Sequence, residues 1–159
     1  MKKLYILFAL LICTTTNIHA THLMGGEINY QSIAPNQLKL ILKLYRDCSP
    51  GSITLGNSIT VKIDAIGCTP VSQTLTLHLK AGSGNEITPM CPSVLSPCQG
   101  GSTQITPLGY EEYVYEGIHT LDTSCTSPRI ISFSNCCRNS DITNGGADDP
   151  FYIETVYTP

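Results

Sequence analysis

The adjacent cysteines Cys136 and Cys137, within SFSNCCRN at positions 132–139, are the first feature of this sequence that bears on chemistry. Neighbouring cysteines rarely bridge each other, because the peptide bond between them would be strained in the required geometry. Each thiol therefore takes a distant cysteine or a metal ion as its partner, or stays free. Which outcome is expected depends on the redox compartment of the protein.

The N-terminus predicts an oxidising compartment. Residues 1–20 begin with two lysines after the initiator Met1, continue through an apolar run and end at Ala20, which is the pattern of a cleaved secretory signal peptide. A buried N-terminal helix fits the cationic start less well. The apolar run is shorter than the about 20 residues of a membrane span. A lipid anchor on Cys13 is disfavoured because the large Ile12 precedes it.

The cysteines after the leader are expected to be mostly disulfide-bonded, because exported thiols are oxidised. Connectivity cannot be deduced from sequence alone. Cys91 and Cys98 are the favoured pair, because CPSVLSPC is a proline-rich loop whose ends can meet. Cys48 would then pair with Cys68, and Cys125 with one of the adjacent cysteines. The set is odd, so one member stays free, pairs between chains or has its partner in sequence beyond this chain. The candidates are Cys48, Cys68, Cys91, Cys98, Cys125, Cys136 and Cys137.

Metal binding and catalysis have weaker sequence signals. Zinc is disfavoured because no C-x-x-C motif occurs and the histidines, at 19, 22, 78 and 119, lack paired-ligand spacing. No G-x-S-x-G or comparable nucleophile motif accompanies the histidines, so we expect neither enzymatic activity nor a cofactor. The strands containing His78 and His119 suggest that both histidines face outward.

An acidic stretch near the C-terminus is a weak calcium candidate. TNGGADDPFYIE at 143–154 places Asp148, Asp149 and Glu154 beside two glycines, and calcium prefers such hard oxygen ligands. The spacing does not match an EF-hand loop, and an exposed acidic turn is the favoured alternative.

Two further groups of polar side chains are candidates for structural or ligand-binding roles. Arg46 and Arg138 lie beside cysteines and are expected to pair with carboxylates at strand ends, or to grip acidic or hydroxylated glycans. A tyrosine and glutamate cluster would suit sugars, although strand alternation favours packing. Asp47, Glu111 and Glu112 are the carboxylates considered for Arg46. The sugar cluster comprises Tyr110, Tyr113, Tyr115, Glu111, Glu112 and Glu116.

The elements that must position these residues are β-strands. In residues 36–48, four leucines at alternate positions, 38 to 44, fall on one side of the chain, which is the period of two of a half-buried strand. Further segments alternate or are rich in β-branched and aromatic residues, with glycine- and proline-rich turns between them. The expected strands are 26–33, 36–48, 59–66, 73–80, 111–121, 129–135 and 151–157. The fold class is therefore all-β, an antiparallel sandwich of about seven or eight strands, immunoglobulin-like or related and stapled by disulfides.

The charge excludes one class of partner. The formal net charge is −3, the leader contains two of the lysines, and Lys39, Lys43 and Lys62 are scattered along strands. No basic surface is left for nucleic acid or anionic lipid. We expect one domain over 21–159, which is either free-standing or a fragment of a longer chain.

Several blocks of the sequence resemble a known family. THLMGGEINY (21–30), NQLKLILKLYRDCSPG (36–51), EEYVYEGIHTL (111–121), ISFSNCCRNSDITN (131–144) and FYIETV (151–156) occur in this order. They resemble the N-terminal domain of large gliding-motility-associated surface proteins of Bacteroidetes. The resemblance implies further β-sandwich repeats of the PKD type and a sorting domain for type IX secretion downstream, neither of which follows Pro159 here.

The sequence therefore leaves two functional classes in contention. The favoured one is a non-enzymatic secreted or cell-surface module with a structural or adhesion-like role, partnered by neighbouring β-sandwich domains. The alternative is a module that binds surface glycans or proteins, with or without calcium.

Overall fold

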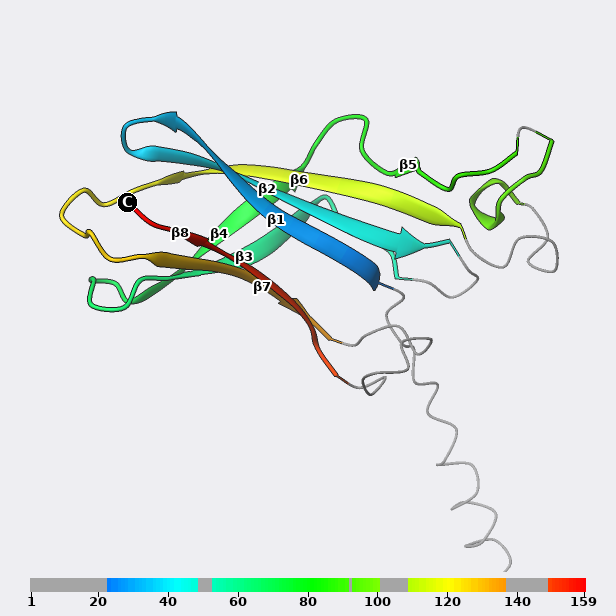
Figure 1. Cartoon of the computed structure of the whole chain (residues 1–159). Helices are drawn as coiled ribbons and strands as arrows, with labels where there is room; N and C mark the ends of the chain where they lie inside the picture. Colours follow the sequence, from blue (N-terminus) through cyan, green and yellow to red (C-terminus); the bar gives the residue numbers. More distant parts are fainter. Residues whose placement is uncertain (1–22, 49–52, 92, 101–108, 137–148) are drawn as a thin grey trace, which may run out of the picture.

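The computed structural model describes residues 23–48, 53–91, 93–100, 109–136 and 149–159. The described residues form eight strands and one short 3-10 helix, η1 (Figure 1). The strands are β1 (Leu23–Ala34), β2 (Gln37–Asp47), β3 (Ser58–Asp64), β4 (Ser72–Leu79), β5 (Asn85–Glu86), β6 (Tyr110–Thr120), β7 (Arg129–Asn135) and β8 (Phe151–Tyr157), and η1 spans Pro97–Gln99. The predicted all-β fold class is confirmed.

All eight strands belong to one antiparallel sheet that bends into two layers. The order is β1-β2-β6-β4-β3-β7-β8, with β5 paired to β6. Figure 1 shows β1, β2 and β6 in one layer and β3, β7 and β8 in the other. β4 joins the layers, because it pairs along its length with β3 and through only His78 and Leu79 with β6. β1 in turn contacts β7 and β8.

The core between the layers follows directly from the alternation in β2. Leu38, Leu40, Leu42 and Leu44 are all fully buried, as predicted. Fully burying such a side chain contributes about 1.5–3 kcal/mol. Tyr115 and the inward residues of the second layer, such as Ile63 and Ile131, complete the same cluster.

Two glycines allow the strands to approach closely. A Cβ on Gly117 in β6 would lie 2.6 Å from Leu77 Cδ2 in β4, where the sheet turns between layers. A Cβ on Gly26 in β1 would lie 2.8 Å from Lys43 O and 3.2 Å from Phe151 Cζ in β8. Both positions therefore serve the packing of strands against one another.

The seven expected strands are confirmed, with small shifts at their ends. The structure adds β5 and η1, which are too short for a periodicity signal. The predicted leader lies outside the described residues. No helix in the described ranges combines the length and hydrophobicity that a membrane-spanning helix requires.

Candidate functional site

The disulfides differ from the favoured pairing. Cys48 is bonded to Cys98 and Cys68 to Cys125, whereas Cys91 is free and exposed. The three favoured pairings, Cys91 with Cys98, Cys48 with Cys68, and Cys125 with an adjacent cysteine, are therefore wrong. Cys136 is also disulfide-bonded. Cys137 itself lies outside them.

The predicted disulfide pairing was wrong because the fold brings distant segments of the chain together. Cys48 follows β2, whose end pairs with the beginning of β6, and the segment before β6 contains Cys98. The turn between β3 and β4 and the loop between β6 and β7 lie at the opposite end of the sandwich, where Cys68 meets Cys125 (Figure 1). Each bridge therefore joins segments that are adjacent in space but 50 and 57 positions apart in sequence.

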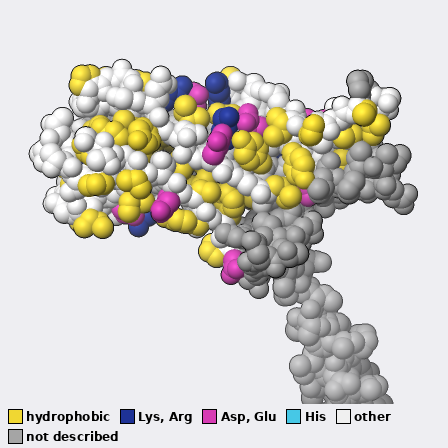
Figure 2. Space-filling view, viewed as in Figure 1, with side chains coloured by type: hydrophobic (Ala, Val, Ile, Leu, Met, Phe, Trp, Pro, Cys, Tyr) yellow, Lys and Arg dark blue, Asp and Glu magenta, His cyan; other side chains and the backbone are white. Residues whose placement is uncertain are grey.

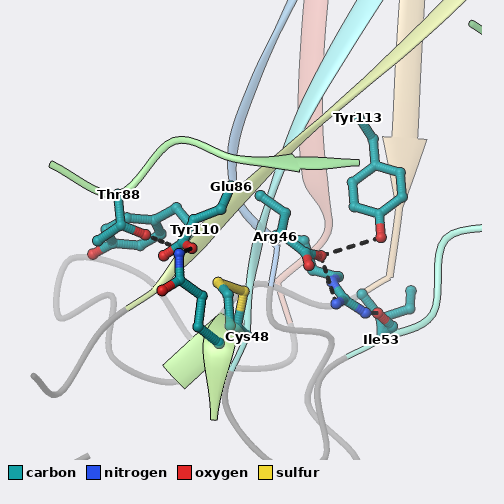
Figure 3. Close-up of a disulfide and its surroundings, with 10 residues drawn as sticks. Arg46, Cys48, Ile53, Glu86, Thr88, Tyr110 and Tyr113 are labelled. Atoms are coloured by element: carbon teal, nitrogen blue, oxygen red, sulfur yellow. Dashed lines mark hydrogen bonds and ion pairs between the residues drawn. A yellow bond between two sulfur atoms is a disulfide. The ribbon is translucent and has the colours of Figure 1, made fainter. Parts of the chain in front are cut away.

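Arg46 organises the polar cluster beside the Cys48–Cys98 bridge. Figure 3 shows its guanidinium pointing toward Ile53 and the carboxylate that Tyr113 also approaches. Nη2 donates to Glu111 Oε2 at 2.6 Å and Nη1 to Ile53 O at 3.0 Å. The Tyr113 hydroxyl donates to the same carboxylate oxygen at 3.1 Å, and the guanidinium carbon lies 5.6 Å from the centre of that ring. The predicted pairing of Arg46 with a carboxylate is confirmed, whereas Arg138 lies outside the described residues.

One group of potential metal ligands in the described residues does not include the calcium candidates that are described. Within the described residues, the group of potential metal ligands that lie close together comprises Cys48, Cys98 and Glu111, with ligand atoms within 4.8 Å of one another. The two sulfurs form a disulfide and therefore do not offer the thiolates that metals bind. The calcium candidates Asp149 and Glu154 are exposed and do not belong to such a group. Asp148 lies outside the described residues.

The tyrosines and glutamates considered as a sugar-binding cluster lie on two faces of β6. Tyr115 is fully buried, and its hydroxyl donates to Gly56 O at 2.8 Å. Burial raises the pKa of Tyr115 to about 12. Tyr113 shares that face, whereas Glu112 and Glu116 lie on the outer face, as the alternation predicted. The packing interpretation, which the alternation favoured, therefore holds for Tyr115.

The outer face of β1, β2 and β6 carries a set of ion pairs. Lys43 Nζ lies 3.1 Å from Glu27 Oε1 and 3.4 Å from Glu112 Oε2, and Lys39 Nζ lies 2.9 Å from Glu116 Oε2. Figure 2 shows basic and acidic side chains next to one another over this layer. Hydrogen bonds to Glu27 and Glu112 raise the pKa of Lys43. Because these charges are already paired across strands, this face is a stabilised exterior.

The outer face of the second layer is chemically different and contains a groove of about 340 Å³. We call it the hydroxyl groove. Five of its side chains carry a hydroxyl, and they come from four strands. The lining residues are Thr60, Val61, Lys62 and Asp64 of β3, Thr74 of β4, Ser132 and Ser134 of β7, and Tyr152 of β8. The cross-strand register brings them together: Lys62 faces Thr74 on one side and Ser132 on the other, and Ser134 faces Tyr152.

The hydroxyl groove offers hydrogen-bond donors, acceptors and an aromatic ring. Lys62 Nζ lies 2.8 Å from Asp64 Oδ2, and that contact, followed by the Ser72 hydroxyl, lowers the pKa of Asp64. Tyr152 is 48% exposed, and its hydroxyl donates to Glu154. This hydrogen bond raises the pKa of Tyr152. Such a combination can bind vicinal hydroxyl groups while the ring packs on an apolar sugar face. The alternating serine and threonine pattern was the available sequence signal, and it was missed.

The two strand histidines occupy different environments. His78 is exposed, as predicted, but His119 is 6% exposed and faces inward, so the prediction of an outward His119 is wrong. Its Nε2 lies 3.4 Å from Gln73 Nε2. Burial and then the charge of Arg129 lower the pKa of His119. It is therefore a neutral interior histidine at neutral pH.

The fold and these sites define a disulfide-braced, antiparallel β-sandwich. Comparison with family models, with curated proteins and with solved structures finds no match for this chain. The resemblance to gliding-motility-associated surface proteins therefore rests on the sequence blocks alone.

Proposed function

We propose that this chain is a secreted or cell-surface structural module with an adhesion-like role and no catalytic activity of its own. In this proposal it acts as the structured head domain of a gliding-motility-associated surface protein exported by type IX secretion. The observation that carries the proposal is the position of the two described disulfides, one at each end of the sandwich. Disulfides persist in oxidising compartments and resist unfolding there.

The path of the chain supports a role beside other domains. β1 begins at the end that contains Cys48–Cys98, and β8 finishes at the end that contains Cys68–Cys125 (Figure 1). The start of β1 and the end of β8 therefore lie at opposite ends of the body. This arrangement suits a module that stands in a row with neighbouring β-sandwich domains.

The redox state of the native protein tests the proposal. The protein would be isolated from its producing cells under rapid thiol alkylation, and bridged peptides would be identified by mass spectrometry. We expect Cys48–Cys98 and Cys68–Cys125 to be recovered as bridges, and Cys91 to be alkylated. Protease added to intact cells should also remove the protein. Recovery with all described cysteines alkylated, or full protection from the protease, would contradict an exposed extracellular location.

The hydroxyl groove favours a second candidate function, which is recognition of a neutral surface glycan. An array of neutral oligosaccharides would be probed with the protein and with Tyr152→Ala, which removes the exposed ring. Lys39→Ala, on the outer face of the other layer, is the matched control. Binding that survives in the control and is lost in Tyr152→Ala would support glycan recognition. If the protein binds no oligosaccharide on the array, the structural role remains the proposed function.

A further inference from the structure

The end of the sandwich that contains Cys68–Cys125 holds a buried cation. Arg129, the first residue of β7, is 3% exposed. Its Nη2 donates to Asp122 O at 3.0 Å and to Cys125 O at 3.2 Å. The guanidinium carbon lies 6.0 Å from the centre of the Tyr157 ring. These contacts hold the guanidinium in place but do not neutralise its charge.

No carboxylate among the described residues lies within 4.0 Å of this guanidinium. Asp122 is nearby, but its Oδ1 accepts hydrogen bonds from the amide of Ser124 at 2.9 Å and from its hydroxyl at 2.7 Å. These two hydrogen bonds lower the pKa of Asp122 more than the Arg129 charge does. The Asp122 carboxylate is therefore held mainly by Ser124 and not by Arg129.

Three N–H groups of Arg129 have no acceptor in the described part of the chain. An arginine has five such donors, and the hydrogen bonds to Asp122 O and Cys125 O use only those on Nη2. Arg129 lines a cavity of about 80 Å³ together with Gln73, Thr120 and the disulfide.

The surroundings of this cavity suit a sugar that carries a carboxylate. A neighbouring depression of about 280 Å³ shares Cys68, Thr69, Asp122 and Cys125 with it and adds the hydroxyls of Ser124 and Ser127. A carboxylate oxygen can accept a hydrogen bond from the remaining N–H groups on Nε or Nη1, and the remaining hydroxyls match a sugar ring. The Asp122 carboxylate in the wall disfavours doubly charged phosphate or sulfate.

We propose that this Arg129 pocket, formed by Cys68, Thr69, Gln73, Thr120, Asp122 and Arg129, binds the carboxylate of a uronic acid unit in an extracellular glycan. A buried cation without a partner anion is costly, so a carboxylate that enters the pocket gains more there than on an exposed arginine. The pocket is separate from the hydroxyl groove and does not depend on the proposed structural role. Failure of carboxylate binding would leave the redox test of that role unaffected.

The experiment is a titration of the oxidised protein with sodium glucuronate, with glucose as the neutral control. Binding is followed by nuclear magnetic resonance, in which the ring of His119, the residue before the pocket residue Thr120 in β6, serves as a reporter. We expect saturable shifts with glucuronate and affinity weaker by about tenfold or more for glucose, because glucose lacks the charged hydrogen-bonding group.

Thr120→Glu tests the position of the site without altering the buried arginine. Thr120 is exposed and lines the cavity, so the new carboxylate should repel the ligand and reduce affinity by about tenfold. Ser58→Glu adds the same charge at an exposed position on β3 at the other end of the sandwich and should bind normally. Unsaturable binding, equal affinity for glucose, or an unaffected Thr120→Glu would overturn the proposal. Stronger competition by a peptide with a free C-terminal carboxylate would overturn the sugar assignment.

Discussion

Opening the Cys68–Cys125 bridge should cost about 4 kcal/mol of unfolding free energy. The bridge joins residues 57 positions apart. In the chain-entropy description, closing a loop of that length restricts the unfolded ensemble by about 4 kcal/mol at 25 °C. The Cys48–Cys98 loop, with a separation of 50, gives nearly the same value because the dependence on length is logarithmic. The corresponding fall in melting temperature is roughly 10–20 °C.

The variant is Cys68→Ser with Cys125→Ser, made in a Cys91→Ser background. Removing Cys91 prevents its exposed thiol from exchanging with the remaining bridge. Urea unfolding would be followed by circular dichroism. Cys91→Ser alone is the control, and its free energy of unfolding should equal that of the parent protein. The urea dependence should steepen, because an unfolded chain with fewer cross-links exposes more surface. A loss below about 1 kcal/mol with an unchanged slope would refute the assignment of this bridge as a main restraint on the unfolded chain.

Three further predictions concern single side chains. Burial lowers the pKa of folded His119, so the free energy of unfolding should fall as the pH drops below about 6.5, where the unfolded histidine takes up a proton. The free energy of unfolding should therefore change less between pH 7 and pH 5 in His119→Gln than in the parent protein. Gly117→Ala should cost about 1–3 kcal/mol through its contact with Leu77, whereas Gly56→Ala, whose Cβ would meet nothing nearer than 3.8 Å, should be nearly neutral in the same melting assay. Lys43→Ala should lower the free energy of unfolding by less than about 1 kcal/mol, because both of its ion pairs are partly solvated. A loss above about 2 kcal/mol at high salt would contradict this view.

His78 and His119 show what the period-two pattern predicts about the faces of a strand. A period of two identifies which residues share a face, and it correctly grouped the leucines of β2 and separated Tyr115 from Glu116. His119 has the parity of the buried Tyr115 and pairs across strands with the buried Leu38, so the alternation itself places it on the inner face. The prediction of an outward His119 did not use this parity, and which of the two faces is covered follows from the second layer, where Gln73 of β4 lies 3.4 Å from the His119 ring.

The two candidate sites also separate what the sequence shows from what depends on the tertiary structure. The serine and threonine alternation of the hydroxyl groove is visible in the sequence, but only the register of four strands brings it together. The Arg129 pocket has no local signal, because its walls come from the β3–β4 turn, the end of β6 and the following loop. Its existence depends on two segments that the Cys68–Cys125 bridge holds together.

By itself, the sequence determined that this chain builds an antiparallel all-β body with a leucine-lined core, because alternation and turn chemistry act over neighbouring residues. The tertiary structure alone decided the partners of Cys48, Cys68 and Cys125, the bend of the sheet at β4 and the burial of Arg129. The physical reason is that each of these depends on which distant strands become neighbours, and local propensity does not specify that choice.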